Sequence, residues 1–260
     1  MTMRNSAIIM LAAAMSLTAA CKTETVEIYP IQDNAEMRLM QRGLFPDAPD
    51  SLISELGLEA GIPSSICAFL VKTEGKEILF DAANGAPDSQ LIPTLRSMEI
   101  SPEDIDHIFI THLHGDHIGG LMHDDAAAFT NAQLHINKTE LDAWLAMPQE
   151  QSAQISKIVN AYGERLKTFV PEDELPYGIS AVEAYGHTPG HTLYRLGDIV
   201  IAGDIMHGTA LQAAYPQFNA RFDMDQAKAS EARKALIRHA AEESLKVYGM
   251  HFPAPHYLEF

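Results

Sequence analysis

Strand-like and helix-like segments alternate along most of the chain. "VEIYPI" predicts a first strand, and "SSICAFLVKTEGKEILFDAANG" predicts two strands joined by a turn at Glu74-Gly75. A helix is expected from Gln90 to Met98. Ser101, with Asp104 three residues later, starts a short helix, and the apolar stretch from His107 to Thr111 then predicts another strand.

The same alternation continues through the second half. "NAQLHI" and "ISAVEAYGH" predict strands, "TLYRLGDIVIAGD" predicts a hairpin turning at Gly197-Asp198, and "LKVYG" predicts a last strand. One helix is expected to begin at Thr139, one to lie between Gln149 and Thr168, and one to run from about Asp225 to Glu243. No linker rich in Pro, Gly or Ser interrupts residues 21–260, so the pattern predicts a single α/β domain built from layers.

Several predicted strands run into a side chain that can bind a metal. His112, His187, Asp204 and His251 each follow such a segment at its C-terminal end. Loops at one edge of a rigid sheet are where functional sites are usually built. We therefore expect these four residues to meet.

The segment "THLHGDHIGG" holds three histidines and an aspartate within six residues. The spacing of His112 and His114 puts both rings on one side of an extended segment, and Asp116 and His117 follow in the first turn of a helix, aimed at a neighbouring position. Two adjacent metal ions are the expected result. Neutral imidazoles and carboxylates suit zinc, and also iron or manganese.

The motifs "THLHGDH", "GHTPGHT", "AGD" and "GMHFP" resemble those of the metallo-β-lactamase superfamily in order and spacing. "HINKTELDAWL" and "FDMDQAKASEARKAL" are more narrowly similar to its methyl parathion hydrolase branch, near the quorum-quenching lactonases. The resemblance implies an αββα sandwich with a dinuclear site. It assigns the first metal to His112, His114 and His187. It assigns the second metal to Asp116, His117 and His251, and a bridging role to Asp204.

Further residues have expected roles around this site. Asp116 could orient the nucleophile and pass a proton to the leaving group. Asp81 resembles a structural aspartate that braces the "HLHGDH" loop, and His191 is expected to support the ligands from behind. His207 either assists at the substrate carbonyl oxygen, where several lactonases have Tyr, or is structural. Trp144 is expected to line the substrate pocket, with core packing as the alternative. Leu44 and Phe45 could also line this pocket.

The N-terminal segment has the composition of an export signal. Arg4 is the only charged residue among the first twenty, and an apolar run leads to "SLTAAC". Residues 1–20 are therefore expected to be an export signal, followed either by a lipid-bearing Cys21 or by cleavage near Ala20.

The chain has 18 Lys and Arg against 35 Asp and Glu, which disfavours nucleic acid and anionic membrane surfaces as partners.

The expected function is that of an exported dinuclear zinc hydrolase. A metal-bridging hydroxide would attack a small ester-like bond, first a lactone or carboxylic ester, with phosphotriesters as a side activity. The alternatives are a β-lactam or thioester hydrolase, and a lipoprotein that binds a metal or ligand without turnover. Zinc β-lactamases usually have Cys where Asp204 stands, and no Cys lies near it. Relatives in this branch often dimerise, so a homodimer stays open.

Overall fold

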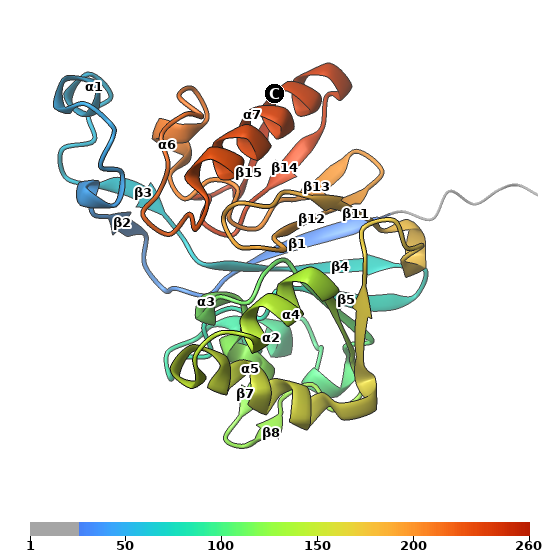
Figure 1. Ribbon diagram of the computed structural model, residues 1–260. Coiled ribbons are helices and arrows are strands. Elements are labelled where there is room, and N and C mark those ends of the chain that lie inside the picture. Colours follow the sequence, from blue (N-terminus) through green and yellow to red (C-terminus); the bar gives the residue numbers. More distant parts are fainter. Residues whose placement is uncertain (1–25) are drawn as a thin grey trace, which may run out of the picture.

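Two mixed β-sheets lie face to face, with helices on both outer surfaces (Figure 1). The computed structural model describes residues 26–260, so the expected export signal and Cys21 lie outside the described range. In Figure 1, α7 covers one sheet, while α2, α4 and α5 cover the other. This confirms the layered α/β domain that the pattern predicts and the αββα sandwich that the family resemblance implies. Among the described residues, no helix is both long and apolar enough to cross a membrane.

The first sheet has six strands in the order β1-β4-β5-β6-β9-β10: β1 (Glu27–Gln32), β4 (Cys67–Thr73), β5 (Lys76–Phe80), β6 (His107–Ile110), β9 (Gln133–Asn137) and β10 (Leu166–Phe169). The second has five in the order β11-β12-β13-β14-β15: β11 (Ser180–Glu183), β12 (Thr192–Leu196), β13 (Ile199–Ile201), β14 (Lys246–Tyr248) and β15 (Tyr257–Glu259). Two small hairpins pair β2 (Arg38–Met40) with β3 (Ile62–Ser64) and β7 (Met122–His123) with β8 (Ala126–Ala127). The helices are α1 (Asp50–Glu55), α2 (Leu91–Ser97), α3 (Gly115–Ile118), α4 (Lys138–Leu145), α5 (Gln149–Tyr162), α6 (Thr209–Gln212) and α7 (Gln226–Glu243).

Strand β4 shows how the layers pack. Successive side chains of a strand point to opposite faces, and β4 is apolar on both. Phe69 and Val71 face the apolar layer between the two sheets, whereas Ala68 and Leu70 face the layer under α2, α4 and α5. A third apolar layer lies between the second sheet and α7. A strand buried on both sides reads as a continuous apolar run, which is why "CAFLV" carries no alternation.

An N-terminal arm, residues 38–64, was not expected from the sequence. It consists of β2, α1 and β3, and it lies beside α6 in Figure 1. The arm has an apolar core of its own, in which Phe45 and Ile62 pack with Leu211 and Ala220. Arg221 also donates from its backbone N to the Leu44 carbonyl. The arm is thus fastened to the segment that follows Asp204.

Local sequence signals account for most element boundaries. Glu74 and Gly75 have φ of 51° and 70°, as a tight hairpin turn requires, and the capping box between Ser101 and Asp104 is present. Two predictions were wrong in detail. Asn137, not Thr139, caps α4, because its side chain accepts from the Thr139 amide. The α5 segment stops at Tyr162, because residues 166–169 pair with β9 as strand β10.

Close backbone contacts require glycine at both Gly119 and Gly120 of the "HIGG" segment. A Cβ at Gly119 would lie 1.9 Å from the backbone oxygen of Asn84, which cannot yield as a flexible side chain could. We expect Gly119→Ala to lower the free energy of unfolding by about 2 to 3 kcal/mol, as overpacking does. Urea denaturation measures this. Gly43→Ala is the control, because nothing lies within 4 Å of its Cβ position; equal stability of the two variants would contradict the prediction.

Candidate metal centre

The seven residues expected to bind metal meet at one end of the sandwich. They come from four loops: those after β6, β13 and β14, and the one that joins β11 to β12. These loops belong to both sheets, so the cluster lies where the two sheet edges meet. The residues that the structure brings together are His112, His114, Asp116, His117, His187, Asp204 and His251.

Three imidazoles converge in the first part of this cluster. The Nε2 atom of His112 and the Nδ1 atom of His114 are 3.0 Å apart, and the Nε2 atom of His187 is 3.1 and 3.0 Å from them. The nearest carboxylate oxygen, Oδ2 of Asp204, is 3.4 Å from the His187 nitrogen. Three ring nitrogens that face one another cannot all be satisfied by hydrogen bonds among themselves. A cation between them would accept all three lone pairs. The donor set therefore fits a metal ion.

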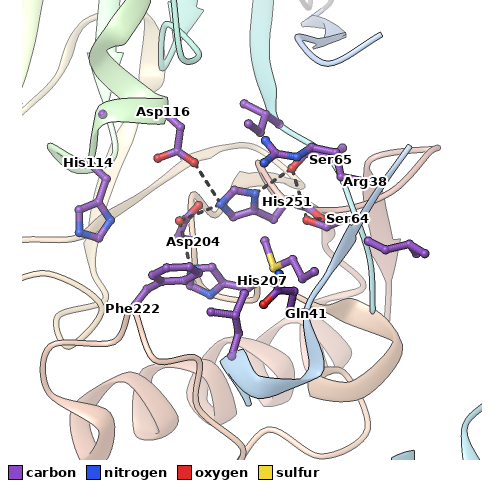
Figure 2. Close-up of a pocket in the computed structure, with 15 residues that line it drawn as sticks. Arg38, Gln41, Ser64, Ser65, His114, Asp116, Asp204, His207, Phe222 and His251 are labelled. Carbon is purple, nitrogen blue, oxygen red and sulfur yellow. Dashed lines mark hydrogen bonds and ion pairs between the residues drawn. The ribbon is translucent and has the colours of Figure 1, made fainter. Parts of the chain in front are cut away.

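The second part of the cluster contains two carboxylates and two imidazoles. The Nε2 atom of His251 is 3.1 Å from Oδ2 of Asp204 and 3.6 Å from Oδ2 of Asp116. Figure 2 shows both carboxylates directed at this ring. The Nε2 atom of His117 and Oδ1 of Asp204 are 3.0 Å apart, yet both are buried without a hydrogen-bond partner among the described residues. Orphaned buried polar atoms of this kind fit a second ion, with Asp204 facing both positions.

Each of three imidazoles is held by its other nitrogen. His117 Nδ1 donates to Asp81 Oδ2 at 2.8 Å, and His251 Nδ1 donates to the Ser65 carbonyl oxygen at 2.8 Å. His187 Nδ1 donates to Asp223 Oδ1 at 3.0 Å. Such partners fix the orientation of each ring and direct its Nε2 atom into the cluster, as metal-binding histidines require.

Asp81 and His191 form hydrogen bonds to the loops that carry the clustered residues. Besides His117, Asp81 accepts from the backbone N and the hydroxyl of Thr111, both at 2.8 Å. The backbone N of Asp204 donates to His191 Nε2 at 3.1 Å, while His191 Nδ1 donates to the Ala184 carbonyl oxygen. His191 thus orients Asp204 from behind.

The model of the Metallo-beta-lactamase superfamily matches residues 62–251, which include all seven clustered residues. The chain belongs to this superfamily. It has the fold and the His/Asp cluster of a metal-dependent hydrolase of that superfamily.

Solved members of the superfamily share the fold over most of their length. The hydrolase AbOPH is 29% identical, with a TM-score of 0.79 over 90% of this chain and 89% of that chain. AidC, a dizinc quorum-quenching lactonase, is 23% identical, with a TM-score of 0.81 over 89% of each chain.

Curated relatives match over shorter segments. Ribonuclease Z of Geobacillus kaustophilus is 43% identical over 72 residues, which are 25% of this chain and 22% of that protein. N-acyl homoserine lactonase of Bacillus thuringiensis is 28% identical over 104 residues, which are 40% of this chain and 38% of that protein. The matches span well under half of either relative, so they transfer no substrate to this chain.

The two halves of the site differ in the pKa of their imidazoles. Burial lowers the pKa of His112 and His187 well below 6.5 and that of His114 to about 4. Burial would also lower the pKa of His117 and His251, but the adjacent Asp204 carboxylate outweighs it and raises both. The first set is thus neutral and ready to bind metal, while the second set keeps its protons to higher pH than the first.

A cavity of about 590 Å³ opens on to the cluster. His114, Asp116, Asp204 and His251 face it, and the arm supplies much of the opposite wall. Figure 2 shows Arg38 and Gln41 of the arm across from Asp116. The apolar lining consists of Leu39, Met40 and Leu44 of the arm together with Ile66 and Phe222.

The expectations for three apolar residues have different outcomes. Leu44 lines the cavity. Phe45 does not, because it is 1% exposed in the core of the arm. Trp144 does not either: its ring packs edge-on against His114, with centroids 5.5 Å apart, and its Nε1–H donates to Glu140. The pocket role predicted for Phe45 and Trp144 is therefore corrected to packing behind the wall.

His207 lies inside the cluster. It is 1% exposed, and its Nε2 atom is 3.2 Å from Oδ2 of Asp204. Its ring stacks on His251, with centroids 5.2 Å apart.

Sequence reasoning missed Asp223 and Arg233. Asp223 accepts from His187 through one oxygen and from Arg233, at 3.1 Å, through the other. Arg233 is 1% exposed and also donates to the Ile205 carbonyl oxygen at 2.6 Å. No local pattern marks this chain of contacts, because His187 and Asp223 lie 36 residues apart in the sequence.

We expect Asp223→Asn to weaken binding of one zinc ion by about 10- to 100-fold, the usual effect of losing such a partner. The amide keeps the volume but leaves the buried guanidinium of Arg233 without its counter-charge. Stepwise zinc affinities from chelator competition measure the effect. Retention of both ions at wild-type affinity would contradict it.

The two metal positions should also differ in proton release. Because the pKa values of His117 and His251 are raised and that of His112 is lowered, the second ion has to displace protons up to a higher pH than the first. The affinity for the second ion should therefore fall more steeply as pH drops from 8 to 6. Calorimetric zinc titrations in two buffers of different ionisation enthalpy measure proton release for each ion; equal release for both would refute this assignment.

Proposed function

We propose that this chain hydrolyses a small substrate with an ester-like bond, a lactone or carboxylic ester first, using two zinc ions held by the seven clustered residues. The observation that carries the proposal is the 590 Å³ cavity that opens directly on to both halves of the cluster. A cavity of this size suits a small organic molecule. AidC is a dizinc lactonase of the same fold, which supports this choice.

Zinc ions bound here would lower the pKa of a coordinated water and stabilise negative charge on a substrate oxygen. His112, His114 and His187 would hold one ion, Asp116, His117 and His251 the other, and Asp204 would contact both. Iron and manganese suit the same donors and are the alternative metals.

Asp116 is the carboxylate placed to move a proton. Its side chain is 33% exposed, whereas that of Asp204 is 3% exposed and enclosed by imidazoles. A proton from the attacking water can therefore reach Asp116 and be returned to the leaving group on the cavity side. This makes Asp116 a catalytic residue as well as a ligand.

His207 is the second candidate catalytic residue. The Nε2 atom of His207 lies 3.2 Å from Oδ2 of Asp204, so a proton on this nitrogen would face the carboxylate. The Nδ1 atom is buried and has no hydrogen-bond partner among the described residues. A role at the substrate carbonyl oxygen would therefore fall to Nε2.

The cavity walls favour a substrate with an apolar part. Leu39, Met40 and Leu44 of the arm line the cavity together with Phe222. They suit an acyl chain or an aryl leaving group, so phosphotriesters with aryl groups are a plausible side activity. A β-lactam or thioester hydrolase and a non-catalytic metal-binding lipoprotein are the alternatives that the experiment below separates.

Location and assembly belong to the same proposal. The composition of residues 1–20 supports export, and Cys21 would carry a lipid anchor as the only link to a membrane. Nucleic acid is not a partner in this proposal, and a homodimer is compatible with it.

We expect the zinc-reconstituted protein to have its highest kcat/KM on a lactone or ester in a panel of acyl-homoserine lactone, aryl ester, aryl phosphotriester and cephalosporin. Asp204→Ala should lower that value by more than about 100-fold, because Asp204 faces both metal positions. Preference for the cephalosporin would favour the β-lactam alternative. No turnover on any substrate with two ions bound would favour the binding protein, and an unchanged kcat in His207→Ala would remove that residue from the chemistry.

A further inference from the structure

Glu140 is a buried acidic residue that the proposed chemistry does not use. It lies on α4, on the outer face of the first sheet (Figure 1), and is 1% exposed. Its Oε1 atom accepts from the backbone N of Leu113 at 2.9 Å and from Trp144 Nε1 at 2.7 Å. Its Oε2 atom accepts from the backbone N of Gly190 at 2.7 Å. A buried carboxylate with three donors is satisfied, so its position is well determined.

The donors belong to two different ligand loops. Leu113 lies between His112 and His114, and Gly190 lies in the loop that carries His187. One carboxylate thus ties together the two backbone segments that deliver the three-imidazole position.

Close packing reinforces this tie. A Cβ at Gly190 would lie 2.3 Å from the backbone N of Glu140, so only glycine allows the loop to approach α4 this closely. Asn137, the N-cap of α4, donates from Nδ2 to the Thr192 hydroxyl at 2.9 Å. The first turn of α4 is therefore fixed to the His187 loop at two points.

Trp144 completes the arrangement one turn later. Its Nε1–H holds Glu140, and its ring lies edge-on against His114, with an interplanar angle of 89°. The same indole thus fixes the carboxylate and limits the rotation of one imidazole. Residues at i and i+4 of a helix lie on one face, which places both functions toward the site.

We propose that Glu140 and Trp144 are positioning residues that set the separation of the two ligand loops, and hence the affinity and geometry of the position formed by His112, His114 and His187. They act through the loops and do not touch substrate. The second position receives none of these contacts. This inference rests on the proposed function only in taking the three imidazoles to hold a metal ion.

Glu140→Gln tests the proposal with almost no change in volume. An amide offers one acceptor oxygen, and its NH₂ group would face a backbone N–H of Leu113 or Gly190. We expect the affinity for one zinc ion to fall by about 10- to 100-fold, as for other partners behind metal ligands, with the other ion unaffected. The absorption spectrum of the cobalt-substituted protein should change at that position. Asp142→Asn is the control, because Asp142 is an exposed acid on the same helix that pairs with Lys138.

Trp144 supplies a second readout, because it is the only tryptophan in the chain. Its fluorescence should be quenched as cobalt fills the three-imidazole position, and Glu140→Gln should shift this quenching to higher cobalt concentration. Trp144→Phe keeps a ring beside His114 but removes the N–H, so its loss of zinc affinity should be smaller than that of Glu140→Gln.

Three outcomes separate this inference from the proposed function. Glu140→Gln with wild-type zinc affinities and an unchanged cobalt spectrum would overturn the inference alone. Equal weakening of both ions would also overturn it, because a general loss of stability predicts that result. Selective weakening of one ion would support it even if no substrate of the panel were hydrolysed, since neither readout depends on turnover.

Discussion

The convergence of three imidazole nitrogens within 3.1 Å of one another is the constraint on which the rest of the structure depends. Neutral rings that face each other in this way repel through their lone pairs unless a cation is shared. His187 cannot turn away, because Asp223 holds its other nitrogen. Burial keeps all three rings neutral at physiological pH, which suits metal binding and opposes protonation. The fold has therefore assembled a set of donors that fits a metal ion.

The surrounding groups can be understood as the means of holding that set in place. Asp81 fixes the loop after β6, Ser65 fixes His251, and Asp223 fixes His187. Each is buried and each accepts from a defined atom, so the cost of burying it is offset by hydrogen bonds. Arg233 in turn supports Asp223, because its guanidinium neutralises that carboxylate within the core. These supports come from the first sheet, from α7 and from the loop before α7.

Much of this could be predicted from the sequence, and the exceptions have a common cause. Strand ends that run into His112, Asp204 and His251 are visible locally, and the structure brings these residues together; their binding of metal stays a prediction. Glu140 and Asp223 could not be found, because their partners in the ligand loops lie 27 to 50 residues away and no periodicity links them. The roles of Phe45 and Trp144 were wrong for the same reason: apolar character predicts burial but not which layer a ring enters.

The most direct test of this account is a crystal structure of the zinc-loaded protein with anomalous diffraction recorded at the zinc edge. The account predicts two anomalous peaks, one among His112, His114 and His187 and one among Asp116, His117 and His251, with Asp204 in contact with both. A single peak, or peaks at other residues, would contradict the claim that this chain is built around a pair of metal ions.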